Sequence, residues 1–575
     1  TISVSGKAYQ SEGGSALANG TAVRAYKNGS TLVGNTTTSG GDGTWSITDG
    51  LTSGDIVTVY IDNDATYKGA VIMVSDGITK TNVDIYGGAL VLRDDVDGTI
   101  TNANVASGWV NDYTDMMATT SGTTNITATS SASIHVYTGD TYLPGGTVTT
   151  QGTGDLRVAT SSIAFLDTDS NTIAGNIIAY DSSLVYINKN TTVNGGSIKT
   201  QGTNNTGNFL YSEGSFTPTV TLSGTGSIAD YNATSTFYAL TISSTGAITS
   251  SSTFAMNNAL TVSSSGNLSP GNGTVYMKNG SSVANSGTLV FNKLDIAASA
   301  TVTSGSSFSV ASDLTVNSSA NLSPSAGTIT ITGGTITNSG TLAFKNLTIA
   351  GSPSTSATFS ITGDLTSSSG TLTTSGGTIT VTGDLAVAGT ITGTGDITVN
   401  GGDVTGNGTL NLTSGTFLLD GAGLFGGNTG WTFDKLTFGN GSGITTSYGN
   451  GTGAITSATT TVANNQTLDA GVSKTWNVTA SHEPFQLQGS FLASSSSFVY
   501  QAANNATVTP ATYYNLEISP SSGSPTIILA TTTGQTITVN NNFTIAGSGA
   551  ATVDTTTRDP VLDVNGNFTI GASDI

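Results

Sequence analysis

The side chains that usually carry catalysis are scarce in this chain. Its 575 residues include only two histidines, and it has no cysteine. The arginines are Arg24, Arg93, Arg157 and Arg558, and the histidines are His135 and His482. Glycan lyases and hydrolases need clustered carboxylates, assisted by Arg, Lys or His, to move protons, but no arginine lies between residues 158 and 557. We therefore predict that the protein is not an enzyme and has no catalytic residues.

Oxygen ligands for a hard cation are spaced at i, i+2 and i+4 in two segments. The first holds Asp95 and Asp97, and the second holds Asp167, Asp169 and Asn171. Loops that chelate Ca²⁺ use this spacing, so these five residues are the predicted metal ligands and Ca²⁺ is the only cofactor expected. Asp62 and Asp64 form a third, shorter fragment. None of the segments continues as an EF-hand, and the alternative, that Asp and Asn simply form turns, remains open.

The elements that carry these residues belong to a repeat. One segment within residues 259–349 occurs twice, at an offset of 54 residues in its first blocks and 53 in its last. The copies run from Leu260-Thr-Val to Leu294-Asp-Ile296 and from Leu314-Thr-Val to Leu347-Thr-Ile349. A fixed period of this kind, filled with strand formers and turn residues, is typical of stacked β arrays.

Within the array, short Thr- and Ile-rich strands alternate with Gly, Asn and Ser breaks. Ile379, Val381, Leu385 and Val387 alternate with smaller or polar residues, which indicates strands with one buried face. The spacing predicts a coil of about 20 residues, two or three of which make up the longer period. The predicted fold class is all-β, with a long parallel β-solenoid.

Five units of the form aromatic-x-x-Leu-x-apolar recur along the chain. They are Phe237/Leu240/Ile242, Phe291/Leu294/Ile296, Phe344/Leu347/Ile349, Phe433/Leu436/Phe438 and Tyr513/Leu516/Ile518. Such rings can serve as sugar-binding platforms. Because stacked coils place like residues above like residues, we interpret the units as core.

The first 95 residues differ from the rest in charge. They hold 16 charged residues (10 acidic and 6 basic), whereas the remaining 480 hold 34 (50 − 16). Six short strands bounded by turn residues predict a β-sandwich here. The predicted strands are Ile2–Ala8, Ala22–Tyr26, Gly43–Ile47, Ile56–Ile61, Ala70–Val74 and Thr81–Ile85. We therefore expect three regions: a sandwich at 1–95, an irregular first part of the solenoid at 96–235 that could cap it, and regular repeats at 236–575.

Two resemblances follow from these motifs. Val4-Ser-Gly6, Ala22–Tyr26, Asp42–Ile47 and the strand after Gly54-Asp55 resemble carboxypeptidase-regulatory-like and immunoglobulin-like domains, which implies a non-catalytic spacer or assembly module. Residues 96–575, with their Gly-Asp-Leu strands and Phe-x-x-Leu-x-Ile units, resemble the repetitive β-solenoid surface proteins of microbes. That resemblance implies an adhesin, filament or surface-layer component that is extracellular or at the cell surface.

The net charge and the hydropathy of the chain limit the classes of partner that it is expected to bind. The formal net charge is −20, which argues against binding nucleic acid or an anionic membrane. No apolar run approaches the ~18 residues of a membrane-spanning helix. Val564–Ile570 is another repeat unit, and we expect the natural chain to continue beyond Ile575.

Three functions remain in view. The leading one is an extracellular structural protein that self-assembles into a homopolymeric filament, sheath or surface layer. The alternative is an adhesin that binds glycans or neighbouring cells, and the third is a polysaccharide lyase or hydrolase. For self-assembly, an alternating strand at the chain terminus, with Thr1, Ile2, Val4 and Tyr9, is the predicted donor to a sheet edge of another copy. Deleting residues 1–9 should then abolish polymers and leave the solenoid folded.

Overall fold

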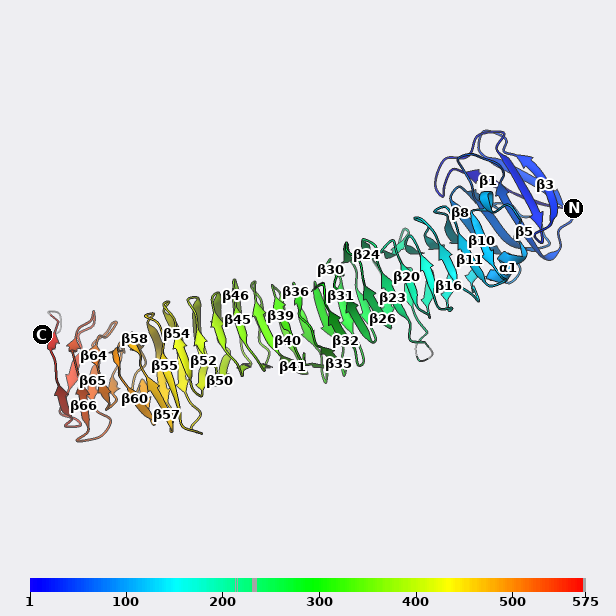
Figure 1. Ribbon diagram of the computed structural model, residues 1–575. Helices are drawn as coiled ribbons and strands as arrows, with labels where there is room; N and C mark the ends of the chain where they lie inside the picture. Colours follow the sequence, from blue (N-terminus) through cyan, green and yellow to red (C-terminus); the bar gives the residue numbers. More distant parts are fainter. Residues whose placement is uncertain (213, 215, 230–234, 572–575) are drawn as a thin grey trace. The chain divides into compact units, whose positions relative to one another are not determined.

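The computed structural model describes residues 1–212, 214, 216–229 and 235–571 (Figure 1). It is nearly all-β, with 2% helix, and it contains a parallel β-solenoid of about 23 turns, so the predicted fold class is confirmed. The chain divides into two compact units. Unit 1 comprises Thr1–Asp295 and Ala300–Val302, and unit 2 comprises Ile296–Ser299 and Thr303–Ile575.

Coils of unit 1 each contribute three strands. One coil holds β12 (Ser133–Val136), β13 (Thr141–Tyr142) and β14 (Val148–Thr150), and the next begins with β15 (Leu156–Val158). The strands of successive coils pair in parallel and in register, so that Ile134 lies opposite Leu156, which lies opposite Ile177 of β18 (Ile177–Tyr180). All three of these side chains are fully buried. The interior is therefore built of stacked aliphatic residues.

Unit 2 repeats this construction with slightly shorter coils. β39 (Thr328–Ile331), β42 (Asn346–Ile349), β45 (Leu365–Ser367) and β48 (Leu385–Val387) pair in series. Ile329, Leu347, Leu365 and Leu385 stack along this series at steps of 18, 18 and 20 residues, and all four are buried. A coil of about 20 residues is therefore confirmed.

The offset between the two copies of the duplicated segment is not a whole number of coils. Leu260 lies in β29 (Ala259–Val262) and its counterpart Leu314 lies in β37 (Leu314–Val316), eight strands later (37 − 29). Phe291 in β33 (Thr288–Phe291) and Phe344 in β41 (Thr341–Phe344) are also eight strands apart (41 − 33). With three strands to a coil, the second copy begins two coils and two strands after the first. The long period therefore reflects duplication of sequence, whereas the coil sets the structural repeat.

The recurrent aromatic units lie in the core, as predicted. The rings of Phe237, Phe291, Phe344, Phe433 and Tyr513 are each at most 2% exposed, and the Leu and final apolar residue of each unit are buried as well. Rings from neighbouring coils meet edge to face, as Phe344 and Phe359 do at 5.5 Å between centroids. These rings are consequently inaccessible to a sugar.

The N-terminal β region consists of two sheets that share one core. The first sheet has the order β4-β1-β7, with β1 (Ile2–Tyr9) between β4 (Thr44–Asp49) and β7 (Ile85–Tyr86). The second has the order β3-β2-β5-β6-β8. Its strands are β3 (Thr31–Thr37), β2 (Ala22–Lys27), β5 (Ser53–Ile61), β6 (Ala70–Asp76) and β8 (Ala89–Asp94). Side chains of both sheets, including Val4, Trp45, Val59 and Val71, form one buried cluster.

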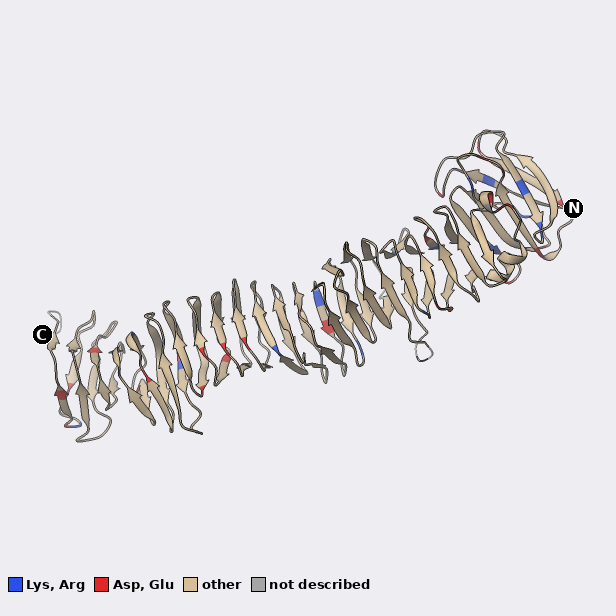
Figure 2. Ribbon diagram, in the orientation of Figure 1, with Lys and Arg blue, Asp and Glu red and all other residues tan. Residues whose placement is uncertain are grey.

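Strand β8 joins the N-terminal region to the solenoid. It pairs in parallel with β6 on one edge and with β12, of the first complete coil, on the other. The second sheet of the N-terminal region therefore continues into the solenoid, although charge density drops at this point of the sequence. In Figure 2, stretches of ribbon coloured as charged residues occur in the N-terminal region and at points along the solenoid.

Two short helices follow β9 (Thr99–Ile100). They are α1 (Asn102–Ser107), which begins with a capping box at Thr101, and α2 (Tyr113–Met116). Asn102 is fully buried, accepts a hydrogen bond from Tyr142 Oη at 2.6 Å and donates to the carbonyl of Thr147 at 3.3 Å. The amide of Asn102 thus attaches α1 to the first coils.

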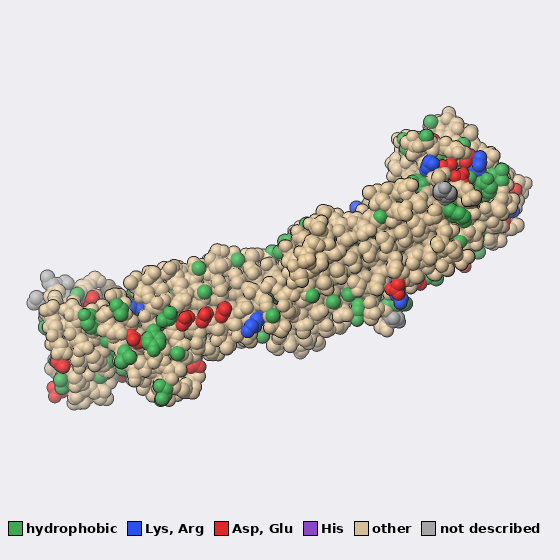
Figure 3. Space-filling view, in the orientation of Figure 1, with side chains coloured by type: hydrophobic (Ala, Val, Ile, Leu, Met, Phe, Trp, Pro, Cys, Tyr) green, Lys and Arg blue, Asp and Glu red, His purple; other side chains and the backbone are tan. Residues whose placement is uncertain are grey.

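A ladder of side-chain to backbone hydrogen bonds follows one corner of the coils in unit 2. The backbone N–H of each corner residue donates to Oδ1 of the equivalent residue one coil earlier. The bonds are Asp364 to Asn346 (3.0 Å), Asp384 to Asp364 (2.9 Å), Asp403 to Asp384 (2.8 Å) and Leu424 to Asp403 (2.8 Å). Figure 3 shows acidic side chains in a line on this part of the surface. Each carboxylate satisfies a backbone donor that the corner leaves outside the sheet.

Candidate functional site

The histidine and arginine of the first coils meet at one carboxylate. Arg157, on β15, donates from Nη1 to Glu12 Oε2 at 2.8 Å and from Nη2 to Asp155 Oδ2 at 3.0 Å. His135, on β12, places Nδ1 3.7 Å from the same Glu12 oxygen. Glu12 lies in the turn after β1, so this cluster attaches the N-terminal region to the coils.

His135 is poorly suited to proton transfer near neutral pH. The side chain is buried, and burial lowers its pKa to about 4, although the Glu12 carboxylate favours the charged form. The imidazole is therefore neutral at pH 7. Because Arg157 already engages both Glu12 and Asp155, the arrangement is that of an ion-pair clamp. Glu12 carried no signal in the sequence, since it lies 145 residues from Arg157.

The first predicted Ca²⁺ segment forms ion pairs and a turn. Oδ1 of Asp95 accepts from Arg93 Nε at 2.9 Å and lies 3.7 Å from Lys80 Nζ. Asp97 Oδ1 accepts from the backbone N–H of Thr99 at 2.9 Å. The two carboxylates thus have separate donors, as the turn interpretation implies, and Ca²⁺ binding at this segment stays a prediction.

The second predicted segment borders an open hollow. Asp169 and Asn171 line it together with threonines of the following coils, and its volume is about 420 Å³. Asn171 is buried and accepts from the backbone N–H of Val148 at 3.0 Å, while Asp169 lies 3.7 Å from Lys189 Nζ. Asp167 Oδ1 is buried without a hydrogen-bond partner among the described residues. Asn171 therefore serves the coil, Asp169 is paired with Lys189, and Asp167 keeps one buried oxygen without a partner among the described residues, so Ca²⁺ binding at this segment also stays a prediction.

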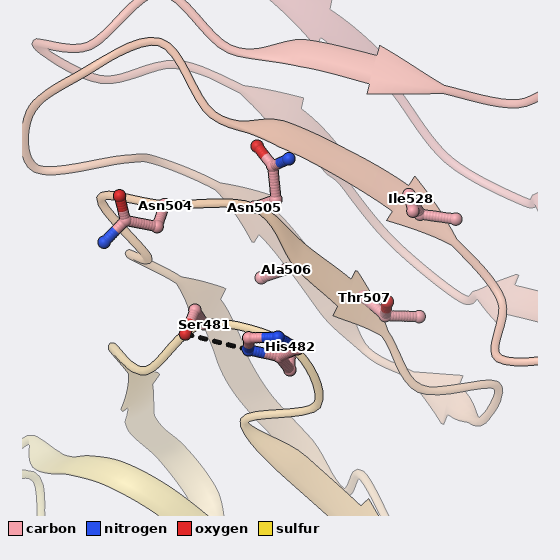
Figure 4. Close-up of a pocket in the computed structure, with 7 residues that line it drawn as sticks. All are labelled: Ser481, His482, Asn504, Asn505, Ala506, Thr507 and Ile528. Atoms are coloured by element: carbon pink, nitrogen blue, oxygen red, sulfur yellow. Dashed lines mark hydrogen bonds between the residues drawn. The ribbon is translucent and has the colours of Figure 1, made fainter.

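A larger hollow lies in unit 2, with a volume of about 540 Å³ (Figure 4). Ser481 and His482 lie on one wall, with Ser481 Oγ 3.0 Å from His482 Nδ1, and Asn504 and Asn505 come from the next coil. Both His482 and Ser481 belong to one loop, in which His482 has a φ of 67°. None of the described residues that line this hollow carries a carboxylate, the group that often orients a catalytic imidazole.

The predicted assembly strand is a central strand of its own sheet. Within β1, Ile2 pairs with Asp49 of β4 and Tyr9 pairs with Tyr86 of β7. Val4 is 3% exposed, and the Tyr9 ring stacks on that of Tyr86 at 5.6 Å between centroids. Thr1 precedes the strand and is exposed. Donation of β1 to another copy would therefore require exchange of the strand between two complete N-terminal regions.

One group of carboxylates among the described residues is compact enough to share a metal ion. Asp62, Asp112 and Asp115 each offer an oxygen, and these atoms lie within 4.8 Å of one another. Asp62 appeared in the sequence as part of a weak fragment, whereas Asp112 and Asp115 carried no signal because they lie about 50 residues away. Only the packing of α2 against the end of β5 brings the three together.

The comparisons with known proteins identify no relative. No family model, no curated protein and no solved structure matches the chain. Among the described residues, no helix is long and apolar enough to cross a membrane.

Proposed function

We propose that this protein is an extracellular structural protein, a subunit of a self-assembling filament, sheath or surface layer. The observation that carries the proposal is the solenoid of about 23 turns, whose recurrent aromatic units are buried in the core. Of the groups that could have been catalytic, Arg157 is engaged in ion pairs with Glu12 and Asp155 of the same unit, and His135 is a buried, neutral imidazole 3.7 Å from Glu12.

A sheet edge without a second hydrogen-bonded strand supports self-association, although β4 lies close to this edge where Gly34 meets Ile47. β3 pairs with β2 on one side only, and its sequence Thr-Leu-Val-Gly-Asn-Thr-Thr contains neither a charged residue nor a proline. Leu32 on this strand is 49% exposed. Edges of monomeric proteins are usually blunted by Lys or Pro, because unpaired backbone groups otherwise accept a strand from another chain. We infer that β3 accepts an extended segment of a second copy.

Electron microscopy of variants at this edge tests the proposal. Leu32→Lys combined with Asn35→Lys places two charges on β3 and should abolish ordered polymers, since burying an unpaired charge at a strand contact is costly. Leu424→Lys is the matched control, because Leu424 is a 39% exposed leucine on a strand paired on both edges.

Each outcome is informative. Polymers that persist in the double variant, with its circular dichroism unchanged, would show that β3 is not the contact. If native protein forms no ordered assembly at any concentration, the structural-subunit proposal fails.

The adhesin remains the second candidate. The hollow is lined by the hydroxyl-bearing Ser481 and Thr507 and by the amides of Asn504 and Asn505, and such groups suit the hydroxyls of a sugar. Binding of monomeric protein to a glycan array, lost in Asn504→Ala with Asn505→Ala, would favour this function over the structural one.

A further inference from the structure

Three acidic side chains converge where the N-terminal region meets the two helices. Asp62 follows the last residue of β5, Asp112 is the residue before α2, and Asp115 lies within α2. One oxygen from each lies within 4.8 Å of the other two. Like charges this close repel one another unless a cation lies among them.

The basic side chains nearby do not balance this charge. Arg24 Nη2 is 2.8 Å from Asp62 Oδ2, and Lys68 Nζ is 2.8 Å from Asp115 Oδ1. Two cations therefore face three carboxylates. Asp112 has no ion pair, and its only hydrogen bonds to side chains among the described residues are long, at 3.3 Å from Tyr60 Oη and 3.3 Å from Thr114 Oγ1.

Asp62 supplies an independent sign of a missing partner. This residue is only 8% exposed, and while Oδ2 receives Arg24, the other oxygen, Oδ1, is buried with no hydrogen-bond partner among the described residues. A buried carboxylate oxygen without a donor is unfavourable. Turn formation does not account for it, because no turn N–H is bonded to this atom.

Asp112 also departs from its usual local role. An aspartate before a helix normally accepts from the backbone N–H two or three residues later. Here the Asp112 side chain makes no capping hydrogen bond, and instead it receives Tyr60 Oη from β5. Its carboxylate therefore accepts from Tyr60 on the cluster side and from the hydroxyl of Thr114 in its own helix, but it caps no backbone N–H.

We propose that Asp62, Asp112 and Asp115 bind a divalent cation, Ca²⁺. Ca²⁺ takes six to eight oxygen ligands in irregular geometry, whereas Mg²⁺ demands near-octahedral sites and keeps most of its water. Three carboxylates from two separated stretches of chain suit the former. The ion would neutralise Asp112, supply the partner that Asp62 Oδ1 lacks, and tie α2 to the end of β5.

Terbium luminescence tests the site directly, because Tb³⁺ replaces Ca²⁺ at oxygen-rich sites and is excited by nearby tyrosines. Tyr60 lies 3.3 Å from Asp112, so bound Tb³⁺ should emit when tyrosine is excited, and added Ca²⁺ should quench the emission. Asp112→Asn is the variant least expected to disturb folding, since it keeps the size of the side chain and one acceptor oxygen, and so loses only one of the two long hydrogen bonds from Tyr60 and Thr114. It should weaken Tb³⁺ and Ca²⁺ binding by about tenfold or more, and Asp62→Asn should do the same.

Two controls complete the experiment. Tyr60→Phe should reduce the luminescence per bound ion while calorimetric Ca²⁺ binding persists. Asp169→Asn removes a carboxylate of the sequence-predicted segment and should leave the titration unchanged. Absence of Tb³⁺ and Ca²⁺ binding to the full chain, or binding lost in Asp169→Asn and retained in Asp112→Asn, would overturn the proposal.

Discussion

The corner ladder of unit 2 allows a prediction from charge alone. Asp384 donates its N–H to Asp364 Oδ1 and accepts from the N–H of Asp403 at Oδ1. The ladder needs one acceptor oxygen per coil, and an amide supplies it as well as a carboxylate does. Asn346 already plays this role at the start of the ladder. Asp384→Asn should therefore keep both hydrogen bonds and remove a negative charge that has a like charge on either side.

The magnitude follows from the coil spacing. Adjacent carboxylates one coil apart are separated by about 4.8 Å, and two unit charges at that distance in water repel by about 0.9 kcal/mol. Two neighbours give about 1.7 kcal/mol, which screening at physiological ionic strength reduces to about 1 kcal/mol. The gain in stability should be about 1.5 kcal/mol at 0.01 M salt and should almost vanish at 1 M salt.

Urea unfolding followed by the fluorescence of the buried Trp431 and Trp476 in unit 2 measures this gain at each salt concentration. Asp420→Asn is the matched control. Asp420 Oδ1 accepts from the N–H of Asn440 at 3.1 Å, and its partner in the preceding coil is the uncharged Asn400. Its Oδ2 also accepts from Asn440 Nδ2 at 2.6 Å, a hydrogen bond that the substitution removes at every salt concentration. That substitution should show no salt-dependent gain. If Asp384→Asn destabilises unit 2, or stabilises it equally at all salt concentrations, electrostatic repulsion along the ladder is refuted.

Two buried ionisable groups predict opposite pH dependences. Burial lowers the pKa of Lys474, whose Nζ donates to the carbonyls of Asn450 and Gly453, to about 8. The unfolded state then binds more protons above pH 8, so unit 2 should gain stability from about pH 8 to 10.5, by up to about 3 kcal/mol, and urea titrations of Lys474→Met should lack this rise. Burial raises the pKa of Asp140 to about 7, so the folded state binds more protons between pH 4 and 7 and loses stability as pH rises through that window. Asp140→Asn keeps an acceptor for the N–H of Asp94 and should raise the melting temperature above pH 7 but not at pH 4, whereas an equal effect at both pH values would contradict the assignment.

The coil was predictable because its information is local. Alternation at Ile379, Val381, Leu385 and Val387 predicted buried strand faces, and each of these side chains is buried. In the N-terminal region five of the six predicted strands correspond to β1, β2, β4, β5 and β6, while the sixth, Thr81–Ile85, overlaps β7 at Ile85 only. β3 was missed because Asn35 and the threonines of Thr31–Thr37 resemble the turn-rich background.

The role of β8 also had no signal in the sequence. Its apolar run, Ala89–Leu92, is consistent with a strand buried on both faces. β8 pairs with β6, which lies before the drop in charge density along the sequence, and with β12, which lies after it. The composition boundary at residue 95 and the continuity of the sheet are separate properties, because backbone pairing does not depend on the charge of the side chains.

The candidate site residues also divide into those that local sequence spacing marks and those that only the fold brings together. The sequence singled out Asp95, Asp97, Asp167, Asp169 and Asn171 from their spacing, and spacing within a loop is what a sequence displays. It left Glu12, Asp112 and Asp115 unmarked, since Glu12 lies 145 residues from Arg157, and Asp112 and Asp115 lie about 50 residues from Asp62.

By itself, the sequence determined that this chain stacks short β coils around an apolar core, because alternation and turn residues act over a few neighbours. The folded structure adds which strand edges stay open, which carboxylates face one another and which lysine is buried. Those outcomes depend on contacts between residues far apart in the chain, and such contacts are set by how the coils and sheets pack rather than by any local pattern.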